Sequence, residues 1–144
     1  MGDRGWMQVT FRTEDKEKIY EAFGPGEWEE DDVLNSGDGT IRQTWAEMNY
    51  GGYDERLELA TAGVLFFGWH SAGDNYDSYR FAAHDGEMNE WQTTQEGKLV
   101  VCAEGGVDLE EAQEVLAYIE FEKEAERQVH NRPQENTNAD EKTC

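Results

Sequence analysis

The stretch from Val64 to Ala103, VLFFGWHSAGDNYDSYRFAAHDGEMNEWQTTQEGKLVVCA, decides the fold class. It divides into short runs rich in aromatic and β-branched residues, separated by turn signals, which is the pattern of strands joined by hairpins. Asp85-Gly86 is the strongest of these signals, because a two-residue turn needs residues that tolerate positive φ. We therefore predict an antiparallel meander. Its strands are expected at Val64–His70, Tyr79–Ala83, Met88–Thr94 and Lys98–Ala103.

The residues on either side of this stretch predict further strands and three helices. Tyr53, Leu57 and Ala60 are the expected apolar face of the middle helix, and Gly63 is its expected stop. The expected elements are a strand at Trp6–Arg12, a helix from the N-cap Thr13 to Phe23, a loop at Glu27–Thr40, a strand at Ile41–Met48, a helix at Tyr53–Ala62 and a long helix from the N-cap Asp108 to about Val129.

No linker or internal repeat interrupts these elements, so residues 1–133 are predicted to form a single α+β domain. The domain should contain an antiparallel sheet of about five to six strands. A short N-terminal helix, a middle helix and a long C-terminal helix should pack on that sheet. Residues 134–144 are polar and are expected to form a disordered tail.

The chain is strongly acidic. Its 144 residues contain 33 Asp plus Glu against 12 Lys plus Arg, a formal net charge of −21 at pH 7. A field of this sign repels phosphate backbones and anionic lipid headgroups, and the few basic residues form no patch. We therefore expect neither direct nucleic-acid binding nor membrane binding.

The N-terminus and the cysteines bear on the compartment. Met1–Trp6 lacks the apolar segment of a signal peptide, and the longest apolar run, Val64–Phe67, is far too short to span a bilayer. Cys102 lies in an apolar run and Cys144 ends a polar tail, so the pair makes no disulfide framework and suits a reducing compartment. A cytoplasmic location is expected, in the host cytoplasm if the chain is phage-encoded.

Catalytic, metal and cofactor motifs give little support for an enzyme. Asp32–Gly39 and Asp74–Asp77 resemble calcium loops, but no register supplies the ligands of an EF-hand. The spacings of zinc sites, nucleophile elbows and phosphate-binding loops are absent, so no cofactor is expected. His70 and His84 could converge across a hairpin with Asp85 to hold a metal or relay a proton. Ordinary hydrogen bonding by strand-end histidines is the preferred interpretation.

The predicted last helix has two candidate faces. Leu109, Ala112, Leu116 and Ile119 follow helical spacing and predict a core face. The opposite side is then acidic and aromatic, which fits either a solvated face or a partner surface where aromatics anchor and carboxylates steer. With the acidic run in the first loop, the candidate partner-binding residues are Glu29, Glu30, Asp31, Asp32, Glu110, Glu111, Glu114, Tyr118, Phe121 and Glu122.

Several segments resemble small proteins of phages and mobile elements that have no assigned activity. These segments are Asn49-Tyr50-Gly51-Gly52-Tyr53, Gly63–His70, Arg80-Phe81-Ala82 and Asp85-Gly86-Glu87, about the middle third of the chain. In size and charge the chain also resembles the acidic anti-CRISPR and anti-restriction inhibitors that imitate DNA. That second resemblance is compositional, and it implies a basic protein partner.

These observations predict an acidic inhibitor, a monomer or homodimer, that blocks a basic, nucleic-acid-binding surface of a host defence complex by DNA mimicry. One alternative is an interaction module that docks through exposed aromatics without mimicry, and another is the small metal-dependent enzyme built on His70, His84 and Asp85. Halophilic adaptation of the surface would also produce this acidity. The aromatics of the interaction module would be Trp28, Tyr76, Tyr79 and Trp91.

Overall fold

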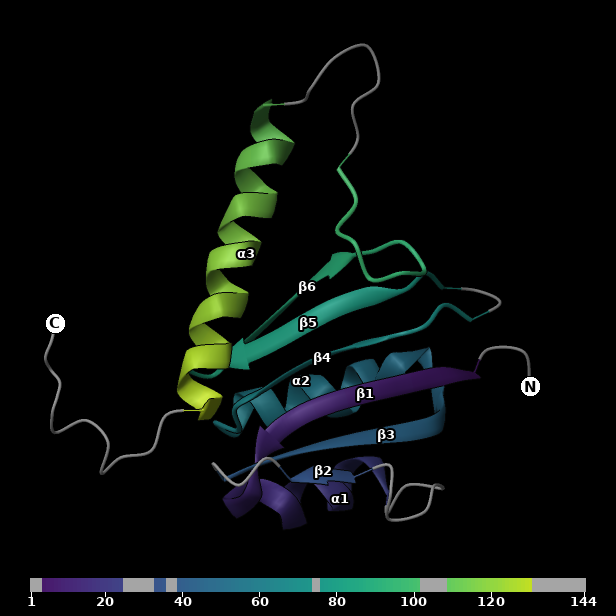
Figure 1. Cartoon of the computed structure of the whole chain (residues 1–144), viewed down its shortest axis with the longest axis vertical. Coiled ribbons are helices and arrows are strands. Elements are labelled where there is room, and N and C mark those ends of the chain that lie inside the picture. The colour runs from purple at the N-terminus through teal and green to yellow at the C-terminus, as the bar shows by residue number, and fades with distance from the viewer. Residues whose placement is uncertain (1–3, 25–32, 36–38, 74–75, 102–108, 131–144) are drawn as a thin grey trace, which may run out of the picture.

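The computed structural model describes residues 4–24, 33–35, 39–73, 76–101 and 109–130, and within them it contains one antiparallel sheet and three α-helices (Figure 1). The predicted α+β class is confirmed. The six strands lie in the order β2-β3-β1-β4-β5-β6. They are β1 (Arg4–Arg12), β2 (Val33–Asn35), β3 (Thr40–Asn49), β4 (Phe66–His70), β5 (Tyr79–His84) and β6 (Glu87–Gln92). The helices are α1 (Lys16–Phe23), which follows a 3₁₀ turn at Thr13–Asp15, α2 (Tyr53–Thr61) and α3 (Leu109–His130).

The helices lie on both faces of this sheet. The alternating side chains Met7, Val9 and Phe11 of β1 are fully buried against α1 and α2, together with Phe66 and Phe81 of β4 and β5. The side chains that alternate with these along each strand point to the other face of the sheet. There α3 crosses β4, β5 and β6. Three layers result, with α1 and α2 on one side of the sheet and α3 on the other (Figure 1).

The predicted meander is confirmed for β4, β5 and β6. His84 pairs with Glu87 across a two-residue turn whose residues Asp85 and Gly86 both have positive φ, 55° and 80°. Lys98–Ala103 was expected to add a strand, and as far as Val101 this expectation is wrong. A single bridge, Thr93↔Leu99, forms instead, and the indole of Trp91 donates to the Val100 carbonyl that a ladder would have used.

Two other expectations change. The predicted loop at Glu27–Thr40 contains the short strand β2, which pairs with β3. On α2 the buried residues are Arg56, Leu59 and Ala60, whereas Tyr53 and Leu57 of the expected apolar face are exposed. Relative to the predicted orientation, α2 is rotated about its axis so that Arg56 points into the interior. Glu90 on β6 supplies the counter-charge there.

Candidate functional site

The long helix α3 buries a different face from the one its sequence suggests. The buried residues are Val115, Tyr118, Glu122, Ala125 and Val129. At 100° per residue this face lies about a third of a turn from the predicted face. Leu109 and Leu116, expected in the core, are 74% and 59% exposed. They lie on the solvent side because the buried face of α3 is centred near Glu122, which pairs with Arg80 on β5.

The predicted partner-binding residues therefore divide into four groups. Glu110 and Glu114 are exposed and Glu111 is half-buried at the start of α3. Tyr118 and Glu122 were expected on the outer side of the helix, and that placement is wrong because both are buried against the sheet. Phe121 is half-buried, and the centroid of its ring lies 4.0 Å from the centroid of the His84 ring. Glu29, Glu30, Asp31 and Asp32 lie outside the described residues.

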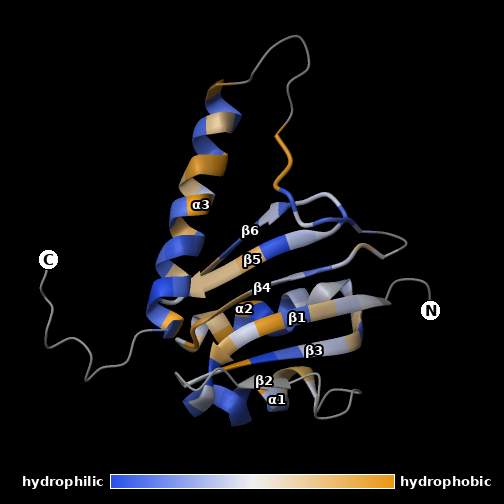
Figure 2. Ribbon diagram, in the orientation of Figure 1, coloured by the Kyte–Doolittle hydropathy of each residue, from blue (hydrophilic) through white to orange (hydrophobic). Residues whose placement is uncertain are grey.

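Negative charge is concentrated in the helices. Counting the 3₁₀ turn, the helical segments contain fourteen Asp and Glu against five Lys and Arg, whereas the strands contain three Glu against four Arg. The helices cover both faces of the sheet, so the acidity is present on two sides of the molecule. Figure 2 shows α3 as largely hydrophilic, with separate hydrophobic bands in the half that extends beyond the sheet.

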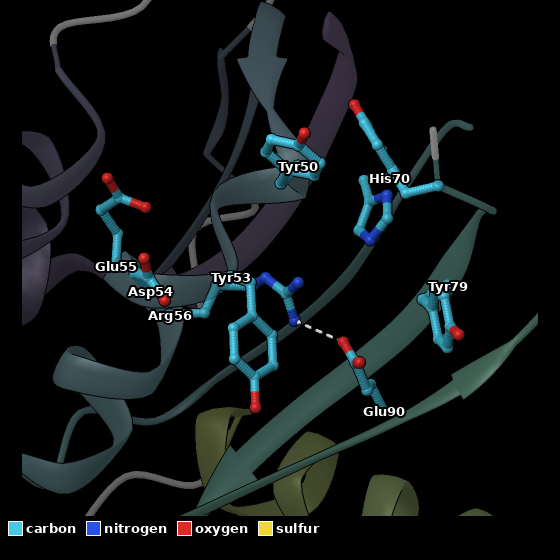
Figure 3. A pocket seen from close by; sticks show the side chains of 9 residues that line it. Tyr50, Tyr53, Asp54, Glu55, Arg56, His70, Tyr79 and Glu90 are labelled. Atoms are coloured by element: carbon cyan, nitrogen blue, oxygen red, sulfur yellow. Dashed lines mark hydrogen bonds and ion pairs between the residues drawn. The ribbon is translucent and has the colours of Figure 1, made fainter. Parts of the chain in front are cut away.

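A pocket of about 520 Å³ opens beside the first turn of α2. It lies on the α1 and α2 side of the sheet, where β4, β5 and β6 pass the turn at Tyr50–Gly52 (Figure 3). Its walls combine four tyrosines with ionisable groups. The lining residues are Tyr50, Tyr53, Asp54, Glu55, Arg56, His70, Tyr76, Tyr79 and Glu90.

The deepest charged group of this pocket is the guanidinium of Arg56, whose side chain is 1% exposed. Its Nε donates to the Gly51 carbonyl at 2.8 Å, and its Nη1 donates to Oε1 of Glu90 at 3.1 Å. The guanidinium carbon lies 4.3 Å from the centroid of the Phe81 ring. Burial lowers the pKa of Arg56, and the carboxylate of Glu90 acts in the opposite direction. The pair and the ring together hold a buried cation in place.

The second buried polar group is the imidazole of His70 on β4. Its Nδ1 lies 2.9 Å from the Ser71 carbonyl oxygen, which can only accept a hydrogen bond, and this contact assigns the Nδ1–H form of the neutral ring. Burial lowers the pKa of His70 to about 4, and the nearby Arg56 acts in the same direction. The ring is therefore uncharged at neutral pH. In Figure 3 it projects toward the Arg56–Glu90 pair.

The turn at Tyr50–Gly52 makes room for that ring. Gly51 has φ 60°, and a Cβ built on it would lie 2.3 Å from Cδ2 of His70. Only glycine satisfies both the left-handed backbone and this close approach. The resemblance to phage proteins rested partly on Asn49–Tyr53 and Gly63–His70, and the structure brings the ends of these two segments together at the pocket.

His70 and His84 do not converge. His70 pairs with Tyr79 at one end of β5, and its ring faces the core, whereas His84 ends the same strand on the side of α3. The Nδ1 of His84 lies 2.7 Å from Oδ2 of Asp85, and its Nε2 is buried without a hydrogen-bond partner among the described residues. The proposed site of His70, His84 and Asp85 is thus separated by the length of a strand. In the described part of the chain no group of three or more His, Cys, Asp or Glu could hold a metal.

No family model matches the chain, and no curated protein or solved structure shows a significant match. Within the described ranges, no helix combines the length and the apolar composition needed to cross a membrane.

Sequence reasoning missed the pocket because its residues come from distant segments. Tyr50 and Tyr53 flank Gly51-Gly52, and the next three residues of α2 also line the pocket. The other contributors lie on β4, β5 and β6, apart from Tyr76, which lies between β4 and β5. One signal was present, since an arginine on the inner stripe of a short helix needs a partner within the fold. Glu90, which occupies an inward position of β6, is that partner.

Proposed function

We propose that the chain is an acidic binding protein that occupies a basic, nucleic-acid-binding surface of another protein and inhibits it by excluding nucleic acid. One observation carries this proposal. On the outer face of α3 the exposed side chains of Leu109 and Leu116 share a stripe with the exposed carboxylate of Glu120, and the carboxylates of Glu110 and Glu114 are exposed to one side of that stripe. An exposed apolar pair within an acidic surface is the composition of an interface with apolar anchors and a charged rim.

The charge of the chain determines which partner fits. Seven Glu against one Lys and one Arg lie on α3, so this helix attracts a cationic surface and repels an anionic one. Basic surfaces that bind nucleic acid carry the matching field, and complementary fields accelerate association. The two leucines take the anchoring role first expected of Tyr118 and Phe121. The resemblance to phage proteins favours a host defence nuclease as the source of the basic surface.

A competition assay tests the proposal. Immobilised chain is presented at low salt with purified restriction endonucleases and RNA-guided nucleases, and bound enzyme is challenged with duplex DNA. We expect at least one nuclease to bind, to be displaced by DNA and to dissociate as salt is raised from 50 to about 200 mM, because such contacts weaken steeply with salt. Its DNA cleavage should fall in the presence of the chain.

Matched variants locate the surface. Glu110→Gln with Glu114→Gln on α3 removes two carboxylates, and Glu17→Gln with Glu21→Gln on α1 removes the same number from another exposed helix. The α3 pair should weaken capture about tenfold while the α1 pair leaves it within about twofold, since charges beyond a Debye length of about 8 Å are screened. Equal effects of the two pairs, or capture indifferent to DNA, would rule out this surface.

A further inference from the structure

We propose that the pocket beside α2 binds a small organic cation, an alkylated ammonium or a guanidinium group. This inference goes beyond the proposed inhibitor and does not depend on it, because the pocket lies on the face of the sheet opposite α3. The ligand chemistry follows from the charge balance, the aromatic walls and the size of the cavity.

The charge balance of the lining is negative. The lining residues include three carboxylates, those of Asp54, Glu55 and Glu90, and one guanidinium, that of Arg56. His70 contributes no positive charge at neutral pH, because burial lowers its pKa to about 4. Two negative charges therefore remain uncompensated among the lining residues. Glu90 already holds Arg56, so the surplus lies with the two carboxylates at the start of α2.

The walls are aromatic. The rings of Tyr50 and Tyr76 have centroids 5.2 Å apart and an interplanar angle of 41°, and Tyr50 and Tyr53 are 47% and 43% exposed. A cation gains about 0.5–1 kcal/mol over an exposed ring and about 2 kcal/mol when it is desolvated. The pocket already accommodates one such ion, since the guanidinium of Arg56 packs on Phe81 and lies 5.5 Å from the centroid of the Tyr53 ring.

Size and hydration exclude other ligands. A cavity of about 520 Å³ is far larger than a bare metal ion, and hard cations need several converging oxygen ligands, which no cluster of the described residues provides. An anion would have to displace Glu90 from Arg56 and then face the other two carboxylates. A weakly hydrated organic cation can interact favourably with both the tyrosine rings and the carboxylates of the lining.

A titration with three probes tests the charge requirement. Choline and methylguanidinium carry the proposed charge, and 3,3-dimethylbutan-1-ol is the uncharged analogue of choline. Proton NMR should show saturable shifts of the tyrosine ring resonances with both cations, at dissociation constants of about 1 mM or tighter, and at least tenfold weaker binding of the alcohol. Binding of the alcohol as tightly as choline, or no saturable shift with either cation, would overturn the proposal.

Variants of exposed lining residues locate the site. Tyr53→Leu keeps an apolar side chain but removes the ring, and Asp54→Asn with Glu55→Gln removes the surplus charge. We expect the first to weaken choline binding about threefold to tenfold and the second at least fivefold. Glu58→Gln on the same helix is the control, because its side chain is exposed outside this pocket. Unchanged affinity in both pocket variants would contradict the site.

Two further measurements separate the sources of the cation and the two proposals. A blocked Gly-Arg-Gly peptide that competes with choline identifies a side chain of a partner as an acceptable ligand, whereas an inactive peptide restricts the site to free cations. Tyr53→Leu should leave nuclease capture unchanged, and the α3 pair should leave choline binding unchanged. If the chain captures no nuclease but still binds choline, the proposed inhibitor function is rejected and the cation pocket is retained.

Discussion

The guanidinium of Arg80 on β5 and the carboxylate of Glu122 on α3 form a two-point ion pair that fastens the long helix to the sheet. Nε of Arg80 donates to Oε2 of Glu122 at 2.9 Å, and a second guanidinium nitrogen donates to Oε1. The hydroxyl of Tyr118 also donates to this carboxylate. The Glu122 side chain is 7% exposed and that of Arg80 is 33% exposed, so the carboxylate is the more costly partner to strand.

Replacing Arg80 alone should therefore destabilise the protein. We expect Arg80→Met to lower the free energy of unfolding by about 2–3 kcal/mol, because the buried carboxylate keeps only the tyrosine hydroxyl as a partner. Arg80→Met combined with Glu122→Leu should recover most of that loss. Urea denaturation measures both. Arg127→Met, which breaks the exposed pair with Glu124 on the same helix, should cost less than about 0.5 kcal/mol.

His70 predicts a pH dependence of stability. Its pKa falls from 6.5 to about 4 in the folded protein, so the unfolded chain binds more protons between these values. The contribution of His70 is complete above pH 6.5, decreases as the pH falls, and is fully lost near pH 4, a change of up to about 3 kcal/mol. His70→Asn should flatten this part of the stability profile relative to the parent.

His130 provides the comparison for that measurement. It is exposed at the end of α3, and His130→Gln should keep the slope of the parent profile between pH 4 and 6.5. The prediction fails if the His70 variant retains the same slope as the His130 variant.

The two glycines Gly51 and Gly63 separate backbone strain from steric overlap. Both have positive φ, but a Cβ on Gly63 meets nothing within 4 Å, whereas one on Gly51 overlaps the ring of His70. Gly63→Ala should cost about 1 kcal/mol and Gly51→Ala about 3 kcal/mol, because only the second adds a clash in a packed region. Thermal and urea unfolding of the two variants should be compared. Equal losses would show that the turn and the histidine are not packed together.

The orientation of α3 can be tested by truncating one residue on each face. Val129→Ala removes buried atoms and should cost about 2 kcal/mol, whereas Leu116→Ala should change stability by less than about 0.5 kcal/mol. If the face predicted from the sequence were the buried one, Leu116→Ala would instead cause the large loss of stability. Urea midpoints of the two variants therefore decide between the two orientations.

Local signals predicted most of the architecture. Asp85-Gly86 marked the hairpin of β5 and β6, and the alternation in β1 placed its side chains in the core. These features depend on backbone preference and on a period of two residues, which neighbouring residues determine. Gly63 likewise marked the end of α2, where its φ is 91°.

Ion pairs between residues that are far apart in the sequence could not be predicted from such local signals. Arg56 and Glu90 are 34 residues apart, and Arg80 and Glu122 are 42 residues apart. Each pair makes a polar side chain part of the interior, so each rotates its helix away from the face with the most apolar residues. Hydrophobic periodicity counts these residues as solvent-facing, and the faces of α2 and α3 were misassigned for that reason.

The central position of β1 affects how the protein can be made and shortened. β1 precedes the other described strands in the chain and is held along one edge by β3 and along the other by β4. During synthesis it therefore has no second neighbour until Phe66–His70 has been made. Deleting β1 would divide the sheet into a pair of strands and a meander of three. A fusion joined ahead of Arg4 leaves both edges intact, whereas a truncation that removes Arg4–Arg12 takes away the strand that joins the two halves of the described sheet.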